Sequence, residues 1–368
     1  MNKGWEQHKL GDFGNVQMNK RIFKSQTLDS GDVPFYKIGT FGKKADAYIS
    51  SELYEEYRNK YPYPKDGDLL ISASGSIGKI VEYKGQKAYY QDSNIVWLDH
   101  DNRILNLFLK AFFQIVKWNG TEGSTIKRLY NKNILNTEII LPKIKEQTAV
   151  GKLIEKVDYL ITLQQRKLEQ LKQLKKAILQ IIASNRLLLH TKKVDMIKVR
   201  VADTYKITRG NVLARSEISN VRTSKYPYPV YSSQTKNHGL MGYYKDFLFK
   251  NAITWTTDGA NAGTVKYRKG KFYSTNVNGV LLSSEGLANQ LTAELLNLVA
   301  FKYVSHVGNP KLMNNTMGEI LFNIPKSVET QQYFSDCIEL VINLIGKQEK
   351  ATDKLNKLKN YLLQKLFI

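Results

Sequence analysis

Apolar residues recur at every third or fourth position along two long stretches of the chain. The central stretch runs from Leu141 to Ile182 and the C-terminal one from Ser327 to Leu366. The first has its apolar positions at Leu153, Val157, Leu160, Ile161, Leu168, Leu171, Leu174, Ile178 and Ile182. The second has them at Phe334, Ile338, Val341, Ile345, Leu355, Leu358, Leu362 and Leu366. This period predicts two long amphipathic helices, each with an apolar seam of coiled-coil type.

The segments outside these helices show shorter apolar runs separated by Gly, Pro and Ser, which is typical of mixed α/β globules. The strands expected in the first globule are Phe35–Ile38, Asp68–Ser72, Lys79–Tyr83, Ile95–Leu98 and Glu138–Leu141. Those expected in the second are Val230–Ser232, Ala252–Thr256, Thr264–Tyr267 and Gly279–Ser283. Helices are expected at Leu105–Val116 and Asn289–Val304. The predicted fold class is mixed α/β (α+β), with domains 1–141, 142–190, 191–325 and 326–368.

The order of globule, helix, globule, helix is an internal repeat, with the two helices at an offset of about 184 residues. The helix segments LKKAILQ (174–180) and LKNYLLQ (358–364) match closely, and the globules match more loosely. Their alignment pairs Gly78 with Gly263, Asn94 with Asn276 and Lys127 with Lys311. Antiparallel pairing of the two helices would bury both seams. It would also relate the two globules by a pseudo-two-fold axis.

The two predicted helices also lead to expectations about the distance between the globules and about contacts with partner proteins. A helix of about 38 residues is about 57 Å long, which would set the distance between the two globules. Residues 143–193 hold 12 Lys or Arg against 4 Asp or Glu, so the helix either lies near DNA phosphates or presents a solvated basic face. The outer face is expected to dock partner proteins. The candidates for that contact are Glu146, Gln147, Gln164, Arg166 and Lys167.

The amino-acid composition limits the classes of function that the chain can have. The 368 residues carry a net charge of +22 and 22 tyrosines, and so basic a protein usually meets a polyanion such as nucleic acid. A generally lysine-rich proteome is the alternative. The single cysteine, Cys337, argues against a disulfide framework or a cysteine-based zinc site. No apolar run is long enough to span a membrane, and the first residues lack a signal sequence, so a cytoplasmic location is expected.

Several short motifs, in their order and duplication, resemble the DNA sequence-specificity (S) subunit of type I restriction-modification systems. They are W-E-x-x-K-L-G-D (5–12), G-S-I-G-K (75–79), L-P-x-x-x-E-Q (141–147), L-K-x-L-K-K-x-I-L-Q (171–180) and L-L-Q-K-L-F-I (362–368). The resemblance covers essentially the whole chain. The second copy departs from it, because it reads I-P-K-S-V-E-T-Q at 324–331 and opens with K-V-R-V-A-D at 198–203.

The resemblance implies a non-catalytic subunit with two target-recognition domains and two helical spacers. Such a subunit binds double-stranded DNA at a split sequence, one half per domain. It also binds two methyltransferase (modification) subunits and, through them, restriction or translocase subunits. S-adenosylmethionine, ATP and Mg²⁺ are expected on those partners, and no cofactor is expected on this chain.

The residues themselves show no catalytic motif. The turn at 72–79 is not a Walker loop, because Ile80 stands where Ser or Thr must follow the lysine, and a tight turn with positive φ at Gly is favoured. No Asn-Pro-Pro-Tyr string occurs, and the five histidines lack metal-ligand spacing. Three alternatives stay open: a self-contained nuclease or methyltransferase, the specificity subunit of a fused methylase–nuclease system, and a coiled-coil scaffold that binds no DNA.

Candidate DNA contacts are loop residues that pair with phosphate or with base edges. In the first globule they are Lys20, Arg21, Lys24, Lys37, Lys43, Lys44, Ser74, Ser76, Lys79, Lys127 and Arg128. In the second they are Arg209, Asn211, Arg215, Arg222, Lys225, Gln234, Lys236, His238, Thr257, Asn261, Arg268 and Lys311. For each one the competing interpretation is a solvated surface residue.

Overall fold

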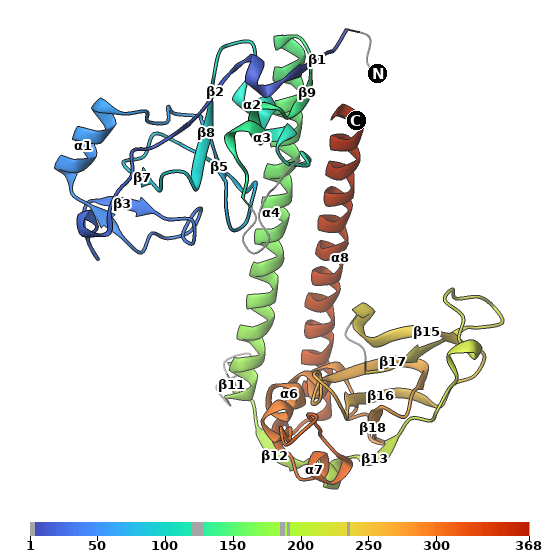
Figure 1. Cartoon of the computed structure of the whole chain (residues 1–368). Helices are drawn as coiled ribbons and strands as arrows, with labels where there is room; N and C mark the ends of the chain where they lie inside the picture. Colours follow the sequence, from blue (N-terminus) through green and yellow to red (C-terminus); the bar gives the residue numbers. More distant parts are fainter. Residues whose placement is uncertain (1–3, 119–127, 185–187, 190–191, 234–235, 368) are drawn as a thin grey trace. The chain divides into compact units, whose positions relative to one another are not determined.

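The computed structural model describes residues 4–118, 128–184, 188–189, 192–233 and 236–367. The chain forms two compact units (Figure 1). Unit 1 contains Met1–Gln164 and Ala351–Ile368, and unit 2 contains Gln165–Lys350. Each unit therefore consists of one globule together with part of both long helices.

The globule of unit 1 contains two sheets. The four-stranded antiparallel sheet has the order β2 (Gly14–Met18), β8 (Ile95–His100), β5 (Leu69–Ser72), β6 (Ile80–Glu82). The smaller sheet has the order β4 (Tyr48–Ile49), β3 (Val33–Tyr36), β7 (Tyr89–Tyr90), and β3 runs parallel to β7. A separate pair joins β1 (Glu6–Lys9) to β9 (Glu138–Leu141). The helices are α1 (Ser51–Lys60), α2 (Asn106–Phe112) and α3 (Asn131–Leu135).

The four-stranded sheet of unit 1 buries apolar side chains on both faces. Alternation along each strand sends Leu69 and Ile71 toward α2, where they pack with Phe108. The intervening Leu70 joins Trp97 in an aromatic cluster on the other face. That cluster also contains Phe41, Tyr83, Ala88, Tyr90 and Ile95.

The globule of unit 2 is built on one six-stranded sheet. Its order is β13 (Lys206–Arg209), β18 (Asn278–Leu282), β16 (Phe249–Thr256), β17 (Val265–Ser274), β14 (Tyr228–Tyr231), β15 (Leu240–Tyr244). Two further pairs are β12 (Met196–Arg200) with β19 (Leu321–Pro325), and β10 (Leu188–Leu189) with β11 (Lys192–Lys193). The helices are α5 (Val201–Thr204), α6 (Gln290–Ala300) and α7 (Asn314–Gly318). All the strands predicted for both globules are present, although α1 and several edge strands were not predicted.

Two long helices of 40 residues each, α4 (Ile144–Ala183) and α8 (Val328–Phe367), run through the molecule. In unit 1 they are antiparallel: Ile154 packs with Leu363, and four residues further along α4 the carboxylate of Asp158 lies 2.5 Å from Lys359 Nζ. In unit 2, Leu179 and Ile182 of α4 pack near Phe334 and Ile338 of α8. The predicted antiparallel pairing is confirmed.

The predicted seam of the first helix is partly wrong in its phase. Leu153 and Leu160 are exposed by 43% and 38%, whereas the buried row is Val150, Ile154, Val157 and Ile161. Adjacent apolar residues such as Leu153 and Ile154 both satisfy a three-to-four spacing, so periodicity cannot say which one faces the partner helix. Leu174 of α4 and Leu358 of α8 are likewise exposed.

The internal repeat can be read residue by residue from the strand registers. Ile71 pairs with Ile80 and Val96, as Trp255 pairs with Val265 and Gly279. Gly78 and Gly263 then occupy the same place, with φ of 77° and 83°, as predicted. The other two predicted pairs are displaced. Val277 matches Asn94, because their carbonyls accept from Thr257 N and Ala73 N respectively. Arg128 rather than Lys127 matches Lys311, because the bridge from Ser74 to Arg128 repeats as Asp258 to Lys311.

Candidate nucleic-acid interface

In unit 1 four loops converge at one end of the four-stranded sheet. The amine of Lys79 donates to the carbonyl of Phe41 and so joins two of the loops. Ser74 donates to Asn94 Oδ1 over 2.8 Å and also pairs through its backbone with Arg128. We refer to this surface, formed by residues 37–44, 73–79, 91–94 and 128–130, as the loop edge of unit 1.

The loop edge of unit 1 presents basic and polar groups to solvent. Lys43, Lys44 and Ser76 are exposed. Lys37 is half-buried and forms a 2.9 Å ion pair with Asp46, which offsets part of its charge. Three of these four candidates are therefore accessible donors for phosphate or base edges.

Two other candidates on this edge shape the loops. Lys79 is half-buried, with its amine held by a carbonyl on the neighbouring loop. Arg128 is also half-buried, and its Nη2 donates to Ser93 O over 2.9 Å. Their hydrogen bonds position the loops on which Lys43 and Ser76 lie.

The segment after β2 carries three more basic candidates, all exposed. Lys20 lies over the ring of Tyr61 at 5.0 Å, and Arg21 lies over Phe23 at 5.6 Å. Lys24 begins a short 3-10 turn. The mixture of cations and exposed aromatic rings suits a nucleic-acid backbone with neighbouring bases.

Unit 2 forms the corresponding loop edge from residues 232–233, 236–239, 256–264, 274–278 and 311–314. Arg209, at the end of β13, donates to Asn314 Oδ1 over 3.2 Å. Arg209, Asn211, His238 and Lys311 are all exposed. Asn261 is half-buried in the loop that follows β16.

Two candidates in unit 2 are interior residues instead of the exposed loop residues that the sequence predicted. Thr257 is 0% exposed, and its hydroxyl donates to Val277 O over 3.0 Å. Arg268 is 8% exposed, and its guanidinium donates to Thr254 Oγ1 and His238 O and lies 3.8 Å from the ring centroid of Tyr231. Burial lowers the pKa of Arg268 to about 10, so the side chain stays charged at neutral pH.

The remaining candidates of unit 2 lie on the segment that leads into β14. The guanidinium of Arg215 donates to Met241 O, and that of Arg222 donates to Pro227 O. Lys225 lies over the ring of Tyr226 at 5.6 Å. All three are exposed. Lys236 begins the 3-10 turn η4 (Lys236–Gly239), and Lys127 and Gln234 lie outside the described residues.

Lys266 is not among the sequence candidates, although it lies beside Arg268 on the same face of β17. Side chains alternate along a strand, so Lys266 and Arg268 share a face, as do Thr254 and Thr256 on β16. These four residues line one small pocket that is adjacent to the loop edge. The signal that could have identified Lys266 is the Lys-x-Arg spacing that begins in the predicted strand Thr264–Tyr267.

On the helices, the structure corrects one partner-binding candidate. Gln147 is 1% exposed, and its amide accepts from Leu105 N and donates to Arg103 O and Pro142 O, each over 2.9 Å. It therefore fastens the start of α4 to the start of α2 instead of facing a partner. Gln331 occupies the equivalent place and donates to Pro325 O over 2.7 Å.

The other partner-binding candidates keep their expected accessibility. Glu146, Arg166 and Lys167 are exposed, and Gln164 is half-buried. Glu146 also accepts from the backbone N–H of Lys143 over 3.2 Å, which caps the first turn of α4.

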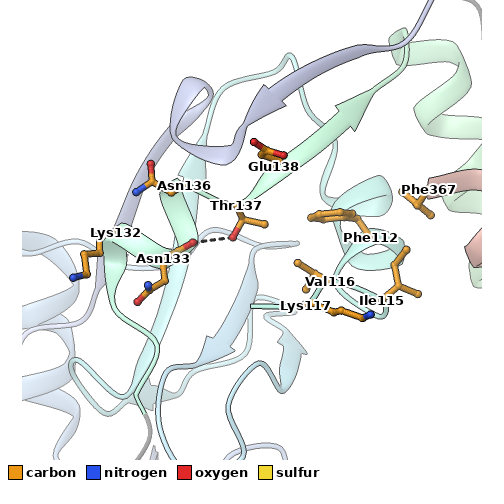
Figure 2. A pocket seen from close by; sticks show the side chains of 10 residues that line it. All are labelled: Phe112, Ile115, Val116, Lys117, Lys132, Asn133, Asn136, Thr137, Glu138 and Phe367. Carbon is orange, nitrogen blue, oxygen red and sulfur yellow. Dashed lines mark hydrogen bonds between the residues drawn. The ribbon is translucent and has the colours of Figure 1, made fainter. Parts of the chain in front are cut away.

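A pocket of about 640 Å³ lies in unit 1. In Figure 2 the apolar side chains of Phe112, Ile115, Val116 and Phe367 lie on one side, and Lys132, Asn133, Asn136, Thr137 and Glu138 lie on the other. The dashed line marks the bond from Thr137 Oγ1 to Asn133 O, 2.8 Å. Among the described residues that line this pocket there is no cysteine, serine or histidine.

Two features are absent from the described part of the chain. No group of three or more His, Cys, Asp or Glu residues is placed to hold a metal ion. No helix there is both long and apolar enough to span a bilayer.

Comparison with known proteins identifies the family. The profile of the type I restriction modification DNA specificity domain matches residues 2–173 and again residues 193–357. The chain belongs to this family. The two matches cover the two halves of the internal repeat.

The curated relatives are specificity subunits by name. A Haemophilus influenzae protein named as a type I restriction enzyme specificity subunit is 56% identical over 153 residues, which are 41% of this chain and 40% of that protein. The type I restriction enzyme MpnII specificity subunit of Mycoplasma pneumoniae is 33% identical over 174 residues, covering 44% of this chain and 51% of that protein. The matches thus span about half the length of these relatives, or less. At the level of the family, the predicted resemblance to type I specificity subunits is confirmed.

Solved structures support the architecture. The S subunit of a type I restriction-modification system from M. genitalium has a TM-score of 0.73 at 15% identity, covering 100% of this chain and 97% of that one. A chain from a study of assembly and conformational transition in the type I system has a TM-score of 0.51 at 13% identity, covering 99% and 98%. These likenesses confirm the predicted fold class of two recognition domains and two long helices.

Proposed function

We propose that the chain reads a split sequence in double-stranded DNA, one word with each globule. The main support is the duplicated loop edge. The same four loops are built twice on the same strand ends, and the two edges expose different polar side chains. Unit 1 exposes Lys43, Lys44 and Ser76, and unit 2 exposes Asn237, His238 and Lys311. Reading two different DNA words requires two binding surfaces with the same backbone geometry and different exposed side chains. The net charge of +22 supplies the attraction to phosphate on which sequence reading is superimposed.

The long helices are proposed to dock two methyltransferase subunits. Apolar residues stand exposed at equivalent positions of the two helices, and repeated exposed apolar positions suit two copies of one partner. The pairs are Ile144 and Val328 (43% and 50% exposed), Leu160 and Leu344 (38% and 41%), and Leu174 and Leu358 (49% and 45%). Glu146, Arg166 and Lys167 would form a polar rim around them.

The partners would supply the chemistry. Restriction or translocase subunits join through the methyltransferases in this proposal, and S-adenosylmethionine, ATP and Mg²⁺ bind to those subunits. This chain then places a methyltransferase over each half-site. Adenine methylation marks the cell's own DNA, and unmarked DNA is cleaved.

The experiment is to co-express the full chain with the methyltransferase encoded beside it and to map methylated adenines across the host genome. We expect one motif made of two short words separated by an unread spacer. Replacing residues 1–141 with the corresponding globule of another family member should change one word and leave the other as it was. A change in both words would contradict the assignment of one word to each globule, and an absence of any motif would contradict DNA reading.

A further inference from the structure

One face of the sheet is chemically different in the two units, although the strands are equivalent. Strand register places Thr254 of unit 2 where unit 1 has Leu70, because Thr254 pairs with Lys266 as Leu70 pairs with Val81. By the same register Arg268 stands in the place of Tyr83. The part of this face that is an aromatic core in unit 1 is thus cationic and rich in hydroxyls in unit 2. Farther along the same face, Ala252, Phe272 and Val280 keep unit 2 apolar.

That surface forms a small pocket whose lining is entirely polar. The lining residues are Ser232, Ser233, Thr254, Thr256, Asn261, Thr264, Lys266, Arg268 and Asn278. Its volume of about 10 Å³ is close to the space that a single water-sized atom occupies. The lining loops, those of Ser233 and Asn261, belong to the loop edge, so the pocket lies within the surface proposed to face DNA.

The side chains that line the pocket carry positive charge without a compensating negative charge. Lys266 and Arg268 are both cationic, and no carboxylate is among the lining residues. Glu294, on α6, influences Lys266 from a distance but forms a 2.6 Å ion pair with Lys175. Arg268 already donates to two oxygens, whereas within the described part of the chain the ammonium of Lys266 has no hydrogen-bond or ion-pair partner. An anion would offset the cost of burying the lysine.

We propose that this pocket takes one non-bridging oxygen of a DNA phosphate, with Lys266 as its principal ligand and the hydroxyls around it as further donors. This inference rests on the proposed function of the loop edge. A phosphate oxygen fits both the size of the pocket and its surplus of donors. A base edge is planar and larger than the pocket, and its recognition would need acceptors in matched positions.

The test compares two variants of the full chain in DNA binding. Lys266→Met removes the charge while keeping a side chain that the strand position tolerates, since the equivalent residue of unit 1 is Val81. The matched control is Lys250→Met, on β16 but exposed and at the end of the strand away from the loop edge. The probes are a duplex with the mapped motif and an unrelated duplex, titrated from about 50 to 200 mM salt.

For Lys266→Met we expect about tenfold weaker binding to both duplexes and a salt slope smaller by about one. The methylated motif should not change, because a phosphate contact carries no sequence information. Lys250→Met should alter neither the affinity nor the slope by more than a small fraction of that. Thermal melting checks that each variant is folded, and Lys266→Gln serves if the methionine variant is not.

Three results would overturn the proposal. One is wild-type affinity and slope in the Lys266 variants. A second is an altered motif, which would mean that the pocket reads a base. The third is Lys266-dependent binding of inorganic phosphate with no change in the DNA slope, which would assign the pocket to a free anion. If the wild-type chain itself showed no sequence-dependent DNA binding, the proposed function would fail, and that outcome is distinct from all three.

Discussion

The two globules have equivalent hydrogen-bonded strands, but they carry chemically different side chains on the same face of the sheet. In unit 1 the face that carries Leu70, Tyr83 and Trp97 is closed by Phe41 from the loop edge. In unit 2 the same face carries Thr254 and Arg268 and stays polar near the loops. The hydrogen bonds between strands are made by backbone groups and do not depend on the side chains. The side chains on one face can therefore change while the strand register and the turns stay the same. A duplicated scaffold can therefore diverge in what it binds without changing its fold.

The parts that do not diverge include the junctions between globule and long helix and one turn of the loop edge. Gln147 and Gln331 make the same bond to a proline carbonyl at the start of α4 and α8. Gly78 and Gly263 make the same left-handed turn. These positions depend on backbone geometry, so substitution there affects folding before it affects recognition.

The largest expected effect comes from giving unit 1 the polar chemistry of unit 2. Leu70→Thr places a hydroxyl in a fully buried aromatic cluster, at 0% exposure, where it also leaves a small cavity. We expect a loss of about 2–4 kcal/mol in the stability of unit 1. Urea unfolding combined with amide hydrogen exchange of β5 measures it. Leu28→Thr is the control, because Leu28 is 47% exposed and should change stability by less than about 0.5 kcal/mol. Equal losses in the two variants would refute the comparison.

A smaller effect is expected at the glycines of the two long helices, which differ in packing. A Cβ on Gly151 would lie 2.5 Å from Leu107 Cγ and 2.9 Å from its carbonyl oxygen, so Gly151→Ala should destabilise unit 1 by about 1–3 kcal/mol. At Gly346 of α8 a Cβ would meet nothing within 4 Å. Gly346→Ala should therefore stabilise its helix by about 0.5–1 kcal/mol. Opposite shifts in melting temperature are the expected result, and shifts of the same sign would be inconsistent with the close helix contact.

The smallest effect concerns pH and is specific to the polar face of unit 2. Burial lowers the pKa of Lys266 to about 8, with Arg268 on β17 lowering it further and Glu294 on α6 opposing the shift. In the unfolded chain the ordinary lysine pKa applies, so between about pH 8 and 10.5 the unfolded state binds more protons and stability rises with pH.

DNA affinity should fall over pH 7–9, because the charged form of Lys266 is the phosphate ligand. Affinity measured over this range should be flatter for Lys266→Met; identical profiles would remove Lys266 from the interface.

The sequence alone determined the two long helices, their duplication and the family. The apolar period, the turn glycines and the order of short motifs are local features, so a single chain displays them without its fold. The predicted strands and the equivalence of Gly78 with Gly263 followed from the same local patterns.

Tertiary structure decided which side chains face solvent. It buried Gln147, Thr257 and Arg268, and it placed Ile154 in the helix seam in preference to its neighbour Leu153. It also brought Lys266 into a polar pocket formed by strands and loops far apart in the sequence. The physical reason is that burial depends on which distant segments pack against a residue, whereas hydrophobic period and turn propensity depend only on near neighbours in the chain.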